Sequence, residues 1–295
     1  PQYPRGIQEG NGVPADGDLW VSYSVNKEDM WISRIPVPVS LNASVHADDD
    51  FSKSKEIAEL TDWNIYSPLW APVSLDGQWL KLQDKDPFDY AKVERKIPAS
   101  KELKVSFDLQ AGQNDKGTLQ IEFLDENGIA CSRMELTDDG VFRLKGGSRF
   151  ANMMKYEAGK VYHVEAVLST ADRNIQVYVD GRRVGLRMFY APVAAVERIV
   201  FRTGIPRTFP TVDTPADQTY DLPDAGAQDP LAEYGIANVK TSSTDKDASS
   251  VFLKYADFSH YADYFNGMED ENIVQAIANA KASEWMEENI PLFEC

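Results

Sequence analysis

The sequence predicts an all-β protein built as an antiparallel β-sandwich, and three observations carry this prediction. Short runs in which apolar and polar residues alternate recur from residue 63 onward. Turn signals such as Asn-Gly and Asp-Gly separate these runs at intervals of roughly 8 to 12 residues, a spacing typical of sandwiches. Strands do not alternate with helical segments in this region, so a parallel sheet with crossover helices is not expected.

The clearest strand is expected over residues 101–110, where Leu103, Val105, Phe107 and Leu109 fall on one face. Asn127-Gly128 follows another alternating run and predicts a hairpin turn, because such a pair readily adopts two positive φ angles. The other expected strands of the sandwich cover residues 119–123, 129–136, 141–144, 161–168, 175–179, 184 onward, 196–202, 234–240 and 252–258.

The N-terminal region, residues 1–39, predicts a hairpin that does not belong to the sandwich. Residues 1–18 are interrupted by Pro and Gly so often that they are expected to form coil. Residues 19–25 and 30–35 are rich in aromatic and β-branched residues and should pair around the polar turn 26–29. A two-stranded hairpin alone is marginally stable, so we expect it to need strands from elsewhere.

The remaining segments complete the predicted domain organisation. Residues 40–62 are polar and mixed, and we expect a linker with a short helical turn near 55–60. The sandwich should occupy residues 63–262, interrupted by a long Pro- and Asp-rich surface loop at 204–230. Residues 263–295 are expected to contain a C-terminal α-helix, because their apolar residues between 270 and 288 follow a period near 3.6.

Composition excludes several functions. The chain of 295 residues carries 47 acidic and 30 basic side chains, a net charge of −17. Such a chain lacks the cations that bind nucleic acid phosphates or anionic membrane surfaces. It has no apolar run near 18 residues, so no membrane insertion is expected. With three His and two Cys, far apart in the sequence, it offers no zinc site or disulfide framework. No metal or cofactor is therefore assigned.

The carboxylates near residue 122 invite comparison with the paired catalytic carboxylates of glycosidases, but their spacing does not match. Retaining glycosidases place two carboxyl groups about 5 to 5.5 Å apart around the scissile bond. On one strand this requires alternate positions, whereas Glu122, Asp125 and Glu126 have a different spacing and adjoin the Asn-Gly turn. We therefore expect a solvated hairpin rather than a catalytic pair.

Carbohydrate binding is the more plausible chemistry, because aromatic faces and planar polar side chains bind sugars. The aromatic candidates are Trp63, Tyr66, Trp70 and Trp79. The basic candidates, with one further aromatic residue, are Arg143, Arg149, Tyr178, Arg182, Arg183 and Arg187. Arginine suits a carboxylate-bearing glycan. The alternatives are that the tryptophans pack in a core or between domains, and that the arginines are ordinary surface charge.

Three segments resemble a known protein family. GDLWVSYSVNKEDMWISRIPVP at 17–38 resembles the end of the β-propeller in BNR-repeat, sialidase-like proteins of gut Bacteroidetes. WNIYSPLWAPV at 63–73 and DPFDYA at 86–91 resemble the start of the accessory domain behind that propeller. The resemblance implies a concanavalin- or LamG-like jelly roll in a secreted, periplasmic or extracellular protein of polysaccharide utilisation. Its expected activity is that of a glycoside hydrolase or polysaccharide lyase.

The resemblance also implies partners and leaves alternatives open. The partners would be a glycan or polysaccharide and an N-terminal propeller region, and this chain alone would not be catalytic. Polar candidates at the end of the propeller-like sheet are Glu9, Asn11, Lys27 and Glu28, unless they form only a polar coil and a solvated turn. The acidic loop 213–229 could hold a structural calcium ion, although a solvated loop is the simpler interpretation. A stand-alone, non-catalytic carbohydrate-binding or adhesion module is the alternative function.

Overall fold

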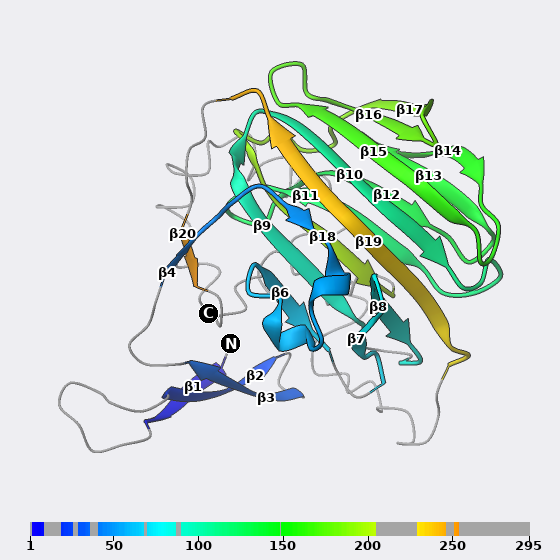
Figure 1. The fold of residues 1–295 in the computed structure, drawn as a ribbon. Coiled ribbons are helices and arrows are strands. Elements are labelled where there is room, and N and C mark those ends of the chain that lie inside the picture. The colour runs from blue at the N-terminus through cyan, green and yellow to red at the C-terminus, as the bar shows by residue number, and fades with distance from the viewer. Residues whose placement is uncertain are drawn as a thin grey trace, which may run out of the picture.

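The computed structural model describes residues 2–8, 19–25, 29–35, 41–67, 70–86, 90–147, 149–204, 229–245 and 251–253. Within these ranges two antiparallel sheets face each other as a sandwich (Figure 1). The predicted all-β antiparallel sandwich is therefore confirmed. The predicted helix in 263–295 lies outside the described residues.

One layer is an eight-stranded sheet with the order β17-β16-β15-β10-β19-β8-β7, in which the short strand β5 pairs with β19. Its strands are β5 (Asp48–Asp49), β7 (Val73–Asp76), β8 (Trp79–Asp84), β10 (Glu102–Ala111), β15 (Val161–Ser169), β16 (Asn174–Val179), β17 (Arg182–Met188) and β19 (Ala232–Ser243).

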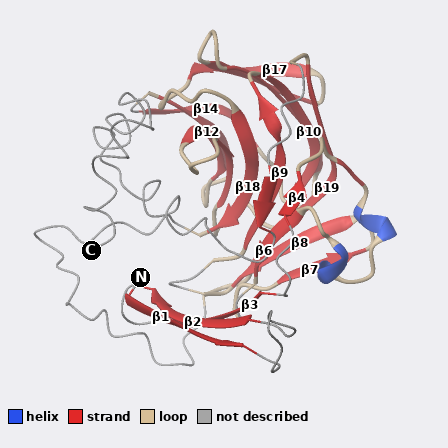
Figure 2. Cartoon of the chain, turned by 90° about the vertical axis from the view of Figure 1, so that its left-hand side faces the viewer, coloured by secondary structure: helices blue, strands red, loops and turns tan. Residues whose placement is uncertain are grey.

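The other layer is a seven-stranded sheet with the order β14-β13-β12-β11-β18-β9-β6. Its strands are β6 (Trp63–Tyr66), β9 (Lys92–Ser100), β11 (Leu119–Leu124), β12 (Ala130–Leu136), β13 (Val141–Gly146), β14 (Arg149–Lys155) and β18 (Val196–Thr203). The strands are bowed, and this sheet lies on the inner side of the bow (Figure 2).

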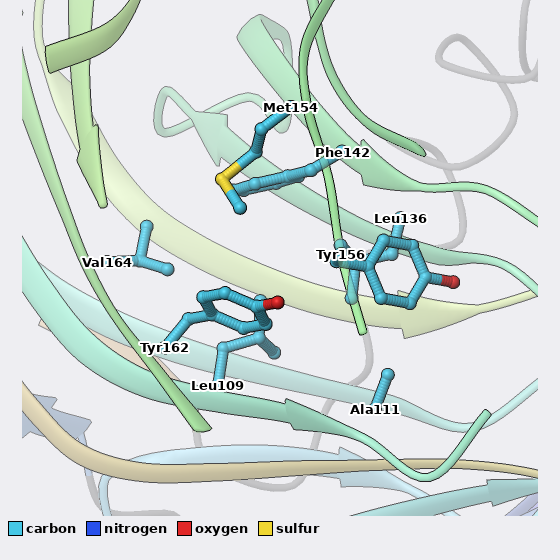
Figure 3. Close-up of a pocket in the computed structure, with 8 residues that line it drawn as sticks. All are labelled: Leu109, Ala111, Leu136, Phe142, Met154, Tyr156, Tyr162 and Val164. Atoms are coloured by element: carbon cyan, nitrogen blue, oxygen red, sulfur yellow. The ribbon is translucent and has the colours of Figure 1, made fainter. Parts of the chain in front are cut away.

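Apolar side chains from alternate positions of both sheets form the core. The rings of Phe107 and Phe201 meet edge to face, with centroids 5.1 Å apart. Near one end of the sandwich a cavity of about 10 Å³ remains between the sheets (Figure 3). Its lining residues are Leu109, Ala111, Leu136, Phe142, Met154, Tyr156, Tyr162 and Val164. A space of this size holds one water at most, so the cavity is a packing defect and not a ligand site.

The N-terminal region forms a separate three-stranded sheet, β1-β2-β3. The predicted hairpin is confirmed as β2 (Leu19–Val25) and β3 (Asp29–Ile35), whose pairing extends to Val25 opposite Asp29. The prediction of coil for residues 1–18 is wrong for β1 (Gln2–Gln8), which pairs with β2. Pro4 and Gly6 mislead here, because an edge strand tolerates both residues and this one contains a register irregularity after Gln2. Within the described residues, the third strand that the hairpin needs comes from its own N-terminal side.

The segment that the sequence predicts as a linker, 40–62, is packed in part against the sandwich. It contains β4 (Leu41–Ala43), which pairs with β20 (Val251–Leu253), then β5 and two 3₁₀ turns, η1 (Phe51–Lys53) and η2 (Ile57–Glu59). The second turn matches the helical turn expected near 55–60. Residues 47–63 are called the strap below, because they run from β5 in the eight-stranded sheet to the start of β6 in the seven-stranded sheet and contact both by side chains.

A buried ion pair fixes the strap. Arg95 on β9 is 1% exposed, and its Nε donates to Asp49 Oδ2 on β5 at 2.8 Å. The same carboxylate oxygen accepts from Trp63 Nε1 at 2.9 Å. Phe51 is buried against the ring of Trp63, with centroids 5.6 Å apart. The strap is therefore a structural part of the sandwich and not a free connection.

The turn after β11 contains a buried carboxylate that makes stability depend on pH. Asp125 Oδ1 accepts from the backbone N–H groups of Asn127 and Ile129, and burial raises the pKa of Asp125 to about 6. Because the folded-state pKa lies above the unfolded value, the charged carboxylate opposes folding above pH 6, and this penalty fades as the pH falls toward 4.

We therefore expect Asp125→Asn to raise the free energy of unfolding by about 1–3 kcal/mol at pH 7.5, since the amide oxygen still accepts both hydrogen bonds. The difference from the wild type should shrink at pH 4. Urea unfolding of both proteins at the two pH values measures this. An Asp125→Asn variant that is less stable at pH 7.5 would show that the hydrogen bonds to the charged form dominate.

Candidate functional site

The face of the seven-stranded sheet turned away from the core is polar. In β11, Leu119, Ile121 and Phe123 enter the core, while Gln120 and Glu122 lie on the opposite face. Pairing with the neighbouring strands extends this polar set across the sheet. Its cations among the described residues are Lys92, Lys96, Arg133, Arg143, Lys145, Arg198 and Arg202, and its carboxylates are Glu94, Glu122, Glu135 and Glu197. We call this surface the inner polar face; its described residues include seven cations and four carboxylates.

Short contacts organise the inner polar face. Arg133 Nε donates to Glu122 Oε1 at 2.6 Å, and one terminal nitrogen of Arg202 donates to Gln120 Oε1 at 2.7 Å. One terminal nitrogen of Arg198 lies 3.5 Å from Glu94 Oε1. These pairs join neighbouring strands, so the charged side chains are held in fixed positions.

The centre of the inner polar face is closed to solvent. Glu122 is 0% exposed and Arg133 is 6% exposed. Burial is the largest influence on Arg133 and disfavours its charge, but Glu122, Tyr190 and Glu135 together outweigh this effect and raise the pKa of the guanidinium. Burial lowers the pKa of Lys96. The Glu122–Arg133 pair is thus an internal ion pair whose two members depend on each other.

Some buried polar atoms of this face have no hydrogen-bond partner in the part of the chain that the structure describes. They include the second carboxylate oxygen of Glu122, the hydroxyl of Tyr190 and Nε of Arg198. Tyr190 packs with Leu124 and Val200 on the same face of the sheet. Unsatisfied buried groups are costly, so these atoms mark positions where water or a bound polar molecule is favoured.

The inner polar face becomes accessible at its β13–β14 edge. The guanidinium of Arg143 lies 4.3 Å from the centroid of the Phe150 ring, and one of its nitrogens donates to Glu135 at 2.8 Å. Lys145 Nζ lies 5.9 Å from the same centroid and 4.7 Å from that of Tyr190. Asn152 pairs with Arg143 across the two strands and is exposed. We call Arg143, Lys145, Phe150 and Asn152 the β13–β14 platform.

The platform combines the groups that bind sugars. A half-exposed aromatic ring, two cations and a planar amide lie on one face of two paired strands. Contacts with Phe150 and Glu135 pre-position the Arg143 guanidinium, whose side chain is 34% exposed. Such a surface can hold a pyranose ring and its hydroxyl or carboxylate groups. Of these four residues the sequence indicated only Arg143.

The aromatic residues singled out from the sequence do not form one cluster. Trp63 is 4% exposed and packs between Phe51 and Phe201, so its faces are not available to a ligand. Tyr66 lies on edge strand β6 and meets Tyr90 edge to face at 5.4 Å. Trp70 is half-buried in the loop before β7. Trp79 lies in the other sheet, on β8.

The basic residues singled out from the sequence are also divided. Arg143 is part of the platform, whereas Tyr178 and Arg183 pair across β16 and β17 in the eight-stranded sheet. Arg182 begins β17 and is exposed. Arg187, on β17 of the eight-stranded sheet, packs against β13 beside the platform. A Cβ atom built on Gly146 of β13 would lie 2.8 Å from the Cβ atom of Arg187. Exposed Arg149 pairs with the same glycine.

Other predictions lie outside the described residues. These include the polar candidates Glu9, Asn11, Lys27 and Glu28. They also include the acidic loop expected to be able to hold calcium, of which Asp229 alone is described. The described ranges contain no group of three or more His, Cys, Asp or Glu side chains suited to a metal ion. No helix in these ranges is long and apolar enough to cross a membrane.

The expectation of a solvated hairpin at residues 122–126 is wrong for two of its three carboxylates. Glu122 is buried on the inner polar face, and Asp125 is buried in the turn, whereas Glu126 is exposed. A polar residue that alternates with apolar ones along a strand is usually expected to face solvent. Glu122 does not, because the pairing of β11 with β12 places Arg133 opposite it. Asp125 directly follows β11, the strand that carries Glu122, and its side chain accepts from backbone N–H groups of the turn.

Comparisons with known proteins agree with this architecture. A Bacteroides sialidase of known structure is 89% identical over 97% of this chain, with a TM-score of 0.75. The chain spans only 26% of that sialidase. The Crh5 transglycosylase matches at 11% identity, covering 77% of this chain and 95% of its own, with a TM-score of 0.52, which shows a shared fold alone. No curated protein matches the chain significantly.

The family comparison is more specific. The model of the sialidase-like carbohydrate-binding module (CBM) domain matches residues 63–218, which include every strand of the seven-stranded sheet. The match begins at Trp63, where the strap joins β6. Since it covers more than half of the 295 residues, the chain belongs to the sialidase-like CBM domain family.

Proposed function

We propose that this chain is the carbohydrate-binding region of a glycan-degrading protein, and that its sandwich binds glycan at the β13–β14 platform. The observation that carries the proposal is the half-exposed Arg143–Phe150 stack at the edge of a sheet face lined with ordered charges. Membership in the sialidase-like CBM family supports the ligand class.

The platform offers two kinds of contact to a sugar. The Phe150 ring can lie against the apolar C–H groups of a pyranose, and Arg143, Lys145 and Asn152 can bond its polar substituents. Among the described residues, the inner polar face behind it carries more cations than carboxylates. The partly exposed guanidinium of Arg143 at its edge favours a glycan that bears carboxylate or sulfate groups.

Phe150→Ala and Lys145→Ala should each weaken binding of a carboxylate-bearing oligosaccharide about fivefold, because each removes one contact worth about 1 kcal/mol. Isothermal titration calorimetry with sialylated and uronate-containing oligosaccharides measures this. Arg183→Ala, an exposed arginine of the other sheet, is the matched control and should bind like the wild type. A loss in Arg183→Ala with none in Phe150→Ala would place the site elsewhere.

The catalytic activity is proposed to reside outside this chain. The similar sialidase is almost four times as long, and the family model that matches describes a binding domain. We propose that the β1–β3 sheet associates with a propeller in the remainder of such a protein, at the cell exterior or in the periplasm. Whether that propeller hydrolyses its glycan or cleaves it by elimination is decided by product analysis with the full-length protein.

A second role for the sandwich, as a support for the propeller, is favoured by the strap. Asp49, Phe51 and Trp63 fix residues 47–63 to the sandwich instead of leaving a free linker. A full-length variant whose strap contacts are broken should then lose propeller activity as well as sandwich stability. An unchanged activity would leave glycan binding as the function of the domain.

A further inference from the structure

We propose a second glycan-binding site on the eight-stranded sheet, where Trp79 covers Gly235, and we assign to it uncharged pyranose rings. The inference rests on the proposed carbohydrate-binding function of the domain but not on the β13–β14 platform, which lies on the other sheet.

The indole of Trp79 lies directly on the backbone of the neighbouring strand. A Cβ built on Gly235 of β19 would lie 3.0 Å from Trp79 Cε3 and 3.4 Å from Cδ2, so the ring occupies the space that a side chain would need. Gly235 pairs with Lys81, two residues from Trp79 on β8 and on the same face. Glycine within a strand weakens it and often marks a close approach by another group. Here the close approach holds a tryptophan against the outside of the sheet.

This tryptophan is not part of the hydrophobic core. Leu80 and Leu82 of the same strand are fully buried between the sheets, whereas Trp79, Lys81 and Gln83 alternate with them on the outer face. Trp79 remains half-exposed after covering Gly235. A large aromatic surface that is fixed on one side and reaches solvent on the other is suited to stacking against a sugar ring.

Polar side chains next to Trp79 form a fixed network. Lys81 Nζ and Gln83 Nε2 donate to the two carboxylate oxygens of Glu233, at 2.8 and 2.7 Å. The backbone N–H of Glu233 donates to Gln113 Oε1 at 2.8 Å. Hydrogen bonds from Lys81 and Gln83 lower the pKa of Glu233, so its carboxylate stays ionised at neutral pH. A carboxylate and an amide held beside an aromatic ring can bond the paired hydroxyls of a sugar.

The charges at this site predict a different ligand from that of the platform. Lys81 and Glu233 neutralise each other, so no excess of positive charge is available for an acidic substituent. The carboxylate of Glu233 would repel a sugar acid and accept from neutral hydroxyl groups. The two sites lie on opposite sheets of the sandwich, so one domain could hold two segments of a mixed glycan.

The test uses the whole chain and a panel of neutral oligosaccharides of β-linked glucose, galactose and N-acetylglucosamine. Trp79→Ala should weaken binding of the best neutral ligand about tenfold, whereas Trp79→Phe should retain most of it and Phe150→Ala should not change it. The thermal midpoint of each variant shows whether it is folded. Trp79→Phe keeps Gly235 covered, so it tests stacking if Trp79→Ala does not fold.

The outcomes separate this inference from the proposed function. Neutral-sugar binding that Trp79→Ala weakens about tenfold and Phe150→Ala leaves intact supports the second site. Equal binding by the wild type and Trp79→Ala overturns it, as does failure of the wild type to bind any neutral probe. In both of those cases, loss of acidic-glycan binding in Phe150→Ala would leave the platform as the functional site. Failure of the wild type to bind neutral and acidic glycans alike would overturn both proposals.

Discussion

Asp49→Ala is expected to lower the free energy of unfolding by about 3 kcal/mol, because buried Arg95 loses its 2.8 Å contact with Asp49 and keeps the longer ion pair with Asp62, at 3.7 Å. Arg95 is 1% exposed and also donates to the carbonyl of Lys96, so it cannot turn to solvent without breaking the strand around it. The same change removes the acceptor of Trp63 Nε1. For a domain of this size the thermal midpoint should fall by about 10 °C.

Asp48→Ala is the matched control for that change, since Asp48 lies next to Asp49 on β5. Its ion pair with Lys240 is 3.1 Å long, but both side chains are largely exposed. Exposed pairs contribute about 0–1 kcal/mol, so this variant should melt close to the wild type. Similar melting of Asp48→Ala and Asp49→Ala would contradict the role of Asp49 in fixing the strap. Calorimetry or circular dichroism measures both.

Glu122→Ala is expected to have a similarly large effect, of about 3–5 kcal/mol, at the centre of the inner polar face. It leaves the guanidinium of Arg133 without the carboxylate that balances its burial. Combining Glu122→Leu with Arg133→Met should restore much of the lost stability, because the charge that needs a partner is then absent. Chemical denaturation of the single and double variants measures the coupling.

The control for the buried Glu122–Arg133 pair is an ion pair of the same length whose side chains are more exposed to solvent. Lys104 Nζ and Glu165 Oε2 also lie 2.6 Å apart, on the eight-stranded sheet, where Lys104 is exposed. Glu165→Ala should cost less than about 1 kcal/mol. If Glu122→Ala costs no more than Glu165→Ala, burial does not decide the strength of these pairs. The inner polar face would then be a hydrated surface.

Regular alternation made most of the sandwich predictable from the sequence. The strand expected over 101–110 is β10, and those expected over 196–202 and 234–240 are β18 and β19. In each, one face enters the core, so hydrophobic periodicity and structure coincide. The expected strand 252–258 corresponds to β20 only at its start, and its other residues lie outside the described ranges.

Strands with charge on both faces escaped prediction. In β9 the side chains of Lys92, Glu94 and Lys96 lie on the inner polar face, while Arg95 turns the other way toward Asp49. Such a strand shows no alternation of apolar and polar residues. The burial of Arg95 depends on Asp49, which lies 46 residues away in the sequence. A pattern over a few neighbouring residues does not reveal such distant partners, so the sequence predicts a linker where the structure has the strap.

The candidate site was predictable only in part for the same reason. Arg143 is conspicuous as a cation in an acidic chain, but Phe150 and Asn152 belong to β14, for which the sequence shows little alternation. The β13–β14 pairing brings them together, with a register shift after Phe142. The sequence named Trp63 and Trp79 together as candidates, and only the structure shows that Trp63 enters the core whereas Trp79 reaches solvent, because sequence alone does not show which ring is buried.

Chemical-shift mapping of the isotope-labelled chain with a carboxylate-bearing oligosaccharide tests the central claim most directly. We expect the amide shifts that change with ligand concentration to concentrate in residues 143–152 of β13 and β14 and around Tyr190, with Phe150→Ala removing them. Shifts confined to other strands, or no saturable shifts with any acidic glycan, would contradict binding at the β13–β14 platform.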